Sequence, residues 1–160
     1  MANENVVGYY QADHDRLEGF FKSFQNLKCT EFPKAKESFK RFHSGLLRHI
    51  KWEEEILFPV FEEKTGHKNE GPTEVMRQEH VQIKAALEAI HDFVRKQDLA
   101  SEAPENELLR VLASHNEKEE QILYPMIDQV TTPEERNEIF KKMEAIPEDA
   151  SGSCCGVSAE

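Results

Sequence analysis

Two short segments of the chain repeat one combination of residue types that bind metal ions. The first, HIKWEEEILFP, spans residues 49–59, and the second, HNEKEEQILYP, spans residues 115–125. Each has a histidine, a glutamate four residues later and then Ile, Leu, an aromatic residue and Pro. Residues four apart lie on the same face of an α-helix, so each segment presents an imidazole beside a carboxylate. Neutral imidazoles and carboxylates are ligands of iron, manganese and zinc.

The repeat extends beyond these two segments. The same interval of 66 residues separates three pairs of candidate ligands: His14 and His80, His49 and His115, and Glu53 and Glu119. Apolar residues keep this interval, for example Leu17 with Ile83 and Phe21 with Leu87. The chain is therefore interpreted as the internal duplication of a helical hairpin.

Four long helices must position these residues. Gly and Pro gather in segments 29–33 and 64–72, with a softer break at 98–104, and between them apolar residues recur at the helical spacing of three and four. The predicted inward stripes are Tyr10, His14, Leu17, Phe21 and Phe24; Phe39, Phe42, Leu46, His49, Glu53, Ile56 and Val60; Met76, His80, Ile83, Leu87, Ile90 and Val94; and Leu108, Leu112, His115, Glu119, Ile122 and Met126. Two hairpins with one apolar face each predict an all-α, up-down-up-down four-helix bundle.

The C-terminal part of the chain predicts a short fifth helix and a tail. In TTPEERNEIF, Thr132 suits the N-cap, Pro133 the first helical position, and Glu134 and Glu135 the first turn. After Pro147 the composition turns to Ser, Gly and Cys. We expect one domain over residues 1–146 and a flexible tail over 147–160 that carries Cys154 and Cys155.

The four histidines of the inward stripes are expected at one level of the bundle, one from each helix, with the two glutamates one turn away. A single histidine on an apolar face is usually an ordinary core residue. Four of them buried with two carboxylates all need partners, however, and a purely structural polar network of this size rarely stabilises a fold. Six donors exceed one tetrahedral zinc site and suit a pair of ions. The expected arrangement has His14 and His49 on one ion, His80 and His115 on the other, and Glu53 and Glu119 bridging them.

Other polar residues are weaker candidates. Glu54 and Glu120 are expected to be solvated, whereas Glu18 is a candidate additional ligand four residues after His14. A ferritin-like site needs Glu-x-x-His on two helices, and the chain has this motif only at Glu88–His91, which we interpret as surface. We interpret His43 and His67 as structural or exposed.

With these motifs in place, residues 9–130 resemble the hemerythrin-like, or HHE cation-binding, domain. The resemblance implies a non-heme di-iron centre, expected to be oxo- or hydroxo-bridged, with manganese or zinc as substitutes. Its ligands fall on His14, His49, Glu53, His80, His115 and Glu119. Oxygen-carrying members have a further histidine where this chain has Lys84, which places a full oxygen-carrier site in doubt.

The resemblance implies a small diatomic ligand, O₂ or NO, that the protein senses, handles or detoxifies. Two alternatives stay open. One is a redox enzyme or a factor for iron–sulfur repair and iron donation, acting on O₂, peroxide or NO, for which Cys154 and Cys155 could serve. The other is an iron-responsive module that binds a protein partner of unknown identity.

Composition excludes several other classes of partner. The net charge is −11 and 32% of the residues are charged, a balance that repels nucleic acid and anionic membranes. No apolar run approaches the roughly 20 residues of a membrane span, and the first residues lack the features of a signal peptide. Three cysteines, two of them adjacent, do not suit a secreted disulfide framework, so we expect a cytoplasmic location.

Overall fold

The computed structural model describes residues 5–148, which form helices joined by short connections and contain no strand. The α-helices are α1 (Val6–Leu27), α2 (Phe32–Trp52), α3 (Phe58–Thr65), α4 (Pro72–Arg95), α5 (Glu102–Lys118), α6 (Tyr124–Val130) and α7 (Pro133–Glu144). Two π-helical turns, Glu53–Leu57 and Glu119–Leu123, join α2 to α3 and α5 to α6. The all-α prediction is confirmed.

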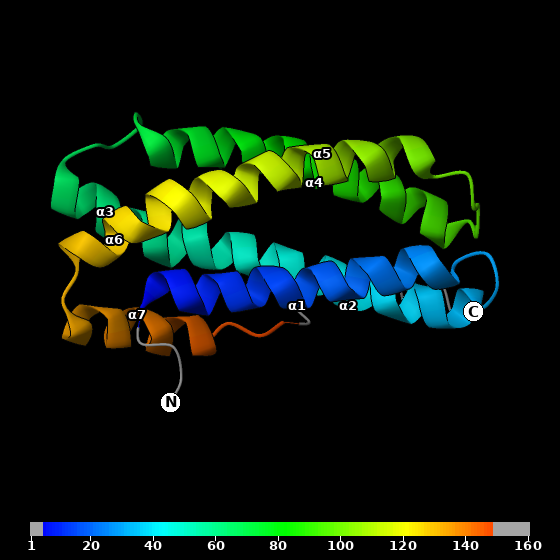
Figure 1. Ribbon diagram of the computed structural model, residues 1–160, viewed down its shortest axis with the longest axis horizontal. Helices are drawn as coiled ribbons and strands as arrows, with labels where there is room; N and C mark the ends of the chain where they lie inside the picture. Colours follow the sequence, from blue (N-terminus) through cyan, green and yellow to red (C-terminus); the bar gives the residue numbers. More distant parts are fainter. Residues whose placement is uncertain (1–4, 149–160) are drawn as a thin grey trace.

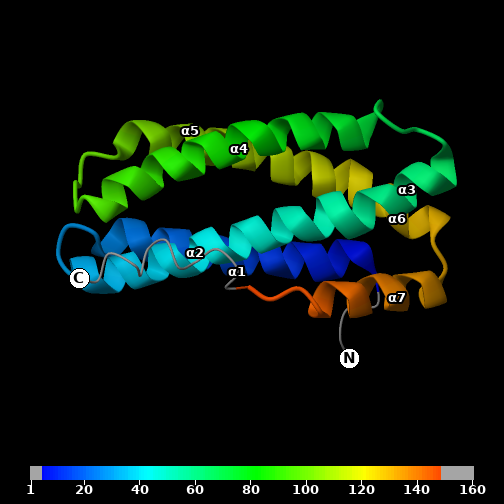
Figure 2. The ribbon, with the colours of Figure 1, turned by 180° about the vertical axis from the view of Figure 1, so that it is seen from behind.

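The long helices form a bundle of two hairpins. α1 packs along α2, and α4 packs along α5 (Figure 1). Successive long helices run in opposite directions, and both views show α7 beside the first hairpin at the end of the bundle that carries α3 and α6 (Figure 2). The predicted helical bundle and short fifth helix are therefore present.

Local signals explain where several helices begin and end. The Asn5 side chain accepts a hydrogen bond of 2.7 Å from the Gly8 amide at the start of α1. Thr132 and Glu135 cap α7 reciprocally, as the sequence predicts for Thr132. α3 ends at Thr65 and is followed by Gly66, whose φ of 79° lies in the left-handed region that glycine adopts without steric cost.

Two apolar clusters lie on either side of a polar layer. The first gathers around the Phe-rich halves of α1 and α2 and includes Phe21, Phe24, Phe39, Phe42, Ile83, Leu87 and Leu108. The second lies at the end with α3, α6 and α7 and includes Tyr10, Trp52, Leu57, Phe58, Phe61, Leu123 and Tyr124. The candidate ligands lie between these clusters, where the packed helices hold them away from solvent.

Each π-helical turn begins at a predicted bridging glutamate. The Phe58 amide donates to the carbonyl of Glu53, five residues back, and the Tyr124 amide donates to that of Glu119. The next residue in each case is proline, which lacks an amide hydrogen and would clash with the carbonyl four residues before it in a regular helix. The wider turn avoids this clash and adds one residue to the helix.

The added residue changes which side chains face the core. Beyond the two glutamates, the predicted stripes are wrong at four positions: Ile56 and Val60 are only partly buried, and Ile122 and Met126 are exposed. The residues one position later are buried instead: Leu57, Phe61, Leu123 and Ile127. The predicted stripes assume a regular spacing of three and four and ignore the extra residue. They therefore point to the wrong core residues after Glu53 and after Glu119.

Replacing Leu123 with Ala is expected to cost about 2–5 kcal/mol of unfolding free energy, because Leu123 is 2% exposed and leaves a cavity. Ile122→Ala, at the neighbouring residue that is 54% exposed, should cost less than about 1 kcal/mol. Urea unfolding of both variants measures the difference. Equal costs would contradict the π-helical register.

Two predictions extend beyond residues 5–148. Cys154 and Cys155, with most of the predicted tail, lie outside the described residues, and the domain limits of 1–146 stay a prediction. Within residues 5–148, no helix combines the length and apolar character needed to cross a membrane.

Candidate metal centre

The structure brings all six predicted ligands together in the interior of the bundle. Their donor atoms form two groups, each with all atoms within 4.8 Å of one another: His14, His49, Glu53 and Glu119, and Glu53, His80, His115 and Glu119. All six side chains are buried, and both glutamates are fully inaccessible. The two groups share Glu53 and Glu119, which is the pairing expected of bridging carboxylates.

Glu53 faces one histidine from each group. Its Oε2 lies 3.3 Å from Nε2 of His49, and its Oε1 lies 3.0 Å from Nε2 of His80. The two oxygens of one carboxylate therefore point to different halves of the site.

Glu119 repeats this arrangement with the other two histidines. Its Oε1 lies 3.3 Å from Nε2 of His14, and its Oε2 lies 3.1 Å from Nε2 of His115. Oε2 nevertheless accepts no hydrogen bond, because the facing ring nitrogen is close but not aligned as a donor. A buried carboxylate oxygen without a hydrogen bond is costly, and a cation between the oxygen and the nitrogen would satisfy both.

The other nitrogen of each histidine contacts a second carboxylate. The Nδ1 pairs are His14 with Glu120 at 2.7 Å, His49 with Asp13 at 2.9 Å, His80 with Glu54 at 2.7 Å, and His115 with Glu79 at 2.8 Å. A carboxylate that accepts from Nδ1–H leaves the lone pair on Nε2, which points into the site. Four carboxylates thus orient four imidazoles in the same way, each through its Nδ1 atom.

The sequence-based interpretation of these partners was incomplete. Glu54 and Glu120 are not simply solvated, since both are partly buried against a histidine ring. Asp13 and Glu79 were missed altogether. The 66-residue interval contained the signal, because it relates Asp13 to Glu79 and Glu54 to Glu120 just as it relates the histidines.

Charge accumulates in this buried layer. Burial lowers the pKa of His49, but the charge of Glu53 and the hydrogen bonds that His49 donates to Asp13 and Glu53 outweigh burial and raise the pKa to about 10. For His80, burial is outweighed by Glu53 and Glu54, and the pKa rises to about 9. In the metal-free protein, protons therefore balance the carboxylates, and bound cations would replace these protons.

Tyr124 places a hydroxyl inside the site, and sequence reasoning gave it no role. The hydroxyl donates to Glu53 and lies 2.8 Å from Oε1 of Glu119 and 3.4 Å from Nε2 of His49. Its counterpart in the first repeat is Phe58, whose ring stacks on His80 with centroids 5.9 Å apart. The two halves of the site therefore differ: a phenol adjoins one and a phenyl ring adjoins the other.

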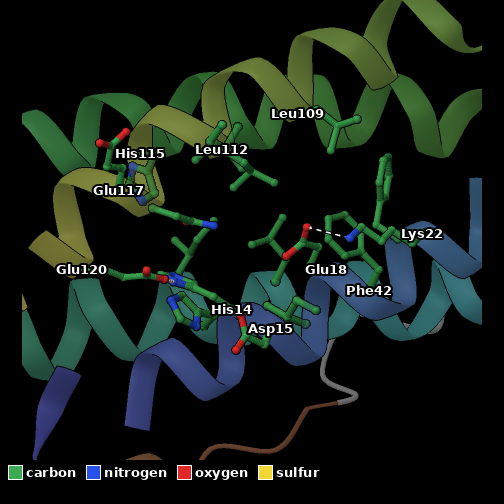
Figure 3. A pocket seen from close by; sticks show the side chains of 18 of the residues that line it. His14, Asp15, Glu18, Lys22, Phe42, Leu109, Leu112, His115, Glu117 and Glu120 are labelled. Atoms are coloured by element: carbon green, nitrogen blue, oxygen red, sulfur yellow. Dashed lines mark hydrogen bonds and ion pairs between the residues drawn. The ribbon is translucent and has the colours of Figure 1, made fainter. Parts of the chain in front are cut away.

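A cavity of about 550 Å³ opens onto the site between α1 and α5. Its apolar lining includes Leu17, Phe21, Phe42, Leu46, Leu109 and Leu112, and it also reaches the buried His14, His49, Glu53 and His115. In Figure 3, Leu109 and Leu112 extend from α5 toward α1. Polar and charged residues line the cavity as well, among them Asp15, Lys22 and Glu117, so a lining of mixed character leads to the donor atoms.

Neither Glu18 nor Lys84 belongs to the two donor groups. Glu18 is exposed and forms an ion pair of 3.2 Å with Lys22 at the cavity rim, so the expectation of an additional ligand there is not supported (Figure 3). Lys84 is also exposed, and its charge contributes to lowering the pKa of Glu54. Position 84 supplies no ligand.

Comparison with known families agrees with this arrangement. A model of the hemerythrin HHE cation-binding domain matches residues 5–146, which cover all seven α-helices and both donor groups. We found no significant match among curated proteins or among solved structures. Because the match spans most of the sequence, the chain belongs to the hemerythrin HHE cation-binding domain family.

Proposed function

We propose that this protein holds a non-heme di-iron centre and binds or reacts with O₂ or NO. The observation that carries the proposal is the sharing of Glu53 and Glu119 by two groups of buried donors. A carboxylate whose oxygens face different groups suits two adjacent ions better than one. Membership of a cation-binding family and the nitrogen and oxygen donors favour iron, while manganese and zinc accept the same ligands.

The donors fit a pair of ions. His14 and His49 would hold one ion, His80 and His115 the other, with one oxygen from each glutamate completing each set. The unpartnered Oε2 of Glu119 and the inward Nε2 atoms support this assignment. Iron takes more than four ligands, so two imidazoles and two carboxylate oxygens would leave room at each iron ion for a small exogenous ligand.

An iron pair, when bound, supplies the one-electron chemistry that O₂ and NO require. The chain's own residues prepare the site for a small, weakly polar ligand. The apolar side chains of the cavity limit bulk water near the donors, and the Tyr124 hydroxyl holds a proton beside Glu53. In the metal-free protein, burial and the charges of Glu119 and Glu53 raise the pKa of Tyr124 well above its ordinary value.

Anaerobic iron loading followed by metal counting and visible spectroscopy tests the proposal. We expect two iron ions per chain and a spectrum that changes when O₂ or NO is admitted. The zinc-loaded protein is the control and should not respond to either gas. An iron-loaded spectrum that neither gas changes would contradict the proposed reactivity while leaving the metal site intact.

Removing the carboxylates that contact Nδ1 is expected to weaken metal binding without removing a ligand. Asp13→Asn should lower affinity by about 10–100-fold, because the partner of His49 no longer carries the charge that orients and polarises the ring. Glu79→Gln should act likewise through His115. Asp15→Asn, at an exposed position, is the matched control. Competition with a chelator measures the affinities, and unchanged values for both variants would refute the orienting role.

A further inference from the structure

A third cluster of donors lies outside the site described above. His43 of α2 and His91 of α4 are 2% and 0% exposed, with ring centroids 4.4 Å apart. Glu88 of α4 contacts both: its Oε2 lies 2.8 Å from Nε2 of His43, and its Oε1 lies 3.2 Å from Nδ1 of His91. The surface interpretation of the Glu88–His91 pair is therefore wrong for His91, because α2 covers its ring.

The cluster is independent of the duplicated site. Its three residues belong to neither of the two donor groups described above. The 66-residue interval relates His43 to Leu109, Glu88 to Lys22 and His91 to Gln25, so the corresponding positions of α5 and α1 carry no equivalent cluster. The Phe39 ring packs against both histidines, with centroids 5.9 Å and 5.8 Å away. The symmetry of the bundle therefore does not explain these residues.

A purely structural network explains the cluster poorly. Nδ1 of His43 is buried without a hydrogen-bond partner, so among the described residues the Nε2 contact with Glu88 is the ring's one hydrogen bond. Glu88 is 54% exposed, so one side of the cluster faces solvent.

We propose that His43, Glu88 and His91 form a mononuclear site for a divalent transition-metal ion of the zinc type. Two imidazoles and one carboxylate, with an open side for water, form the donor set of three-ligand zinc sites. Zinc bonds of this kind place tetrahedral donors about 3.3 Å apart. The observed separations of 2.8 and 3.2 Å run to the two different oxygens of Glu88, and one donor atom from each of the three residues lies within 4.8 Å of the others, so a small movement of the carboxylate would suffice. A bound ion would link α2 of the first hairpin to α4 of the second.

Zinc titration of the full-length chain and its Glu88→Gln variant tests this site. We expect the variant to bind one zinc ion fewer per chain, or to bind that ion at least about 10-fold more weakly. Loss of a residue that binds the metal directly should weaken binding more than loss of a residue that only hydrogen-bonds to a ligand. Because Glu88 is half exposed, circular dichroism should show an unchanged fold. Glu63→Gln, at an exposed glutamate, is the matched control and should bind as the unmodified chain does.

The quantity of interest is the difference in bound zinc between the unmodified chain and Glu88→Gln, so it does not depend on how many ions bind at the duplicated site. Cobalt gives a second readout: the visible absorption of the unmodified chain minus that of Glu88→Gln should show the bands of one low-symmetry ion. Equal zinc stoichiometry and affinity in Glu88→Gln and the unmodified chain would overturn the proposal. An equal loss in Glu63→Gln would also overturn it, by showing that surface charge alone is responsible.

Discussion

Glu53→Gln is expected to abolish tight binding of both iron ions, although it changes a single side chain. The two oxygens of Glu53 face His49 and His80, which belong to different halves of the site. Loss of its charge therefore removes a ligand from each ion and leaves the two cations insufficiently neutralised in a buried layer. Glu119→Gln should have the same effect, because Glu119 faces the other two histidines.

Metal counting after exhaustive dialysis decides this prediction. Glutamine keeps the shape of the side chain, so the bundle should remain folded. Glu55→Gln, at an exposed glutamate in the same π-helical turn, should retain two ions per chain. Retention of two tightly bound irons by either Glu53→Gln or Glu119→Gln would show that the ligand assignment is wrong.

Removal of the metal ions is expected to lower the melting temperature by about 10 °C. Ligands from α1, α2, α4 and α5 and the two π-helical turns meet only in the folded chain, so metal binding contributes directly to folding stability. A free metal concentration about 1,000 times Kd adds about 4 kcal/mol, and each kcal/mol shifts melting by about 2–4 °C at this chain length. Calorimetry with and without a chelator measures the shift.

This stability difference should widen as the pH rises. Folding raises the pKa of His49 to about 10 and that of His80 to about 9, from an ordinary value of 6.5. The protons on these rings therefore stabilise the metal-free fold, and their contribution is complete when the pH is below 6.5. That contribution is lost as the pH rises through 9 and 10, whereas the loaded protein carries no proton on these rings. Glu53→Gln is the control, since its melting should not respond to metal. Equal melting of loaded and metal-free protein would favour a purely structural network.

The sequence by itself determined the candidate ligands and the architecture. His14, His49, His80 and His115 lie in helical stripes whose spacing is a local property of the α-helix, and short connections force neighbouring helices to be antiparallel. These two constraints are sufficient to bring the four rings to one level of the bundle. The 66-residue duplication then gives each half of the chain one glutamate, Glu53 or Glu119, one helical turn after its second candidate histidine.

Only the tertiary structure decided the features that depend on backbone detail or on contacts between helices. The π-helical turns turned Ile122 outward and Leu123 inward, because a hydrogen bond to the fifth residue back adds a residue that apolar spacing does not reveal. The carboxylate partner of each histidine lies on another helix, so its identity depends on how neighbouring helices face each other. The meeting of His43 with His91 depends likewise on the packing of α2 against α4, since these residues are far apart in the sequence and belong to no repeat.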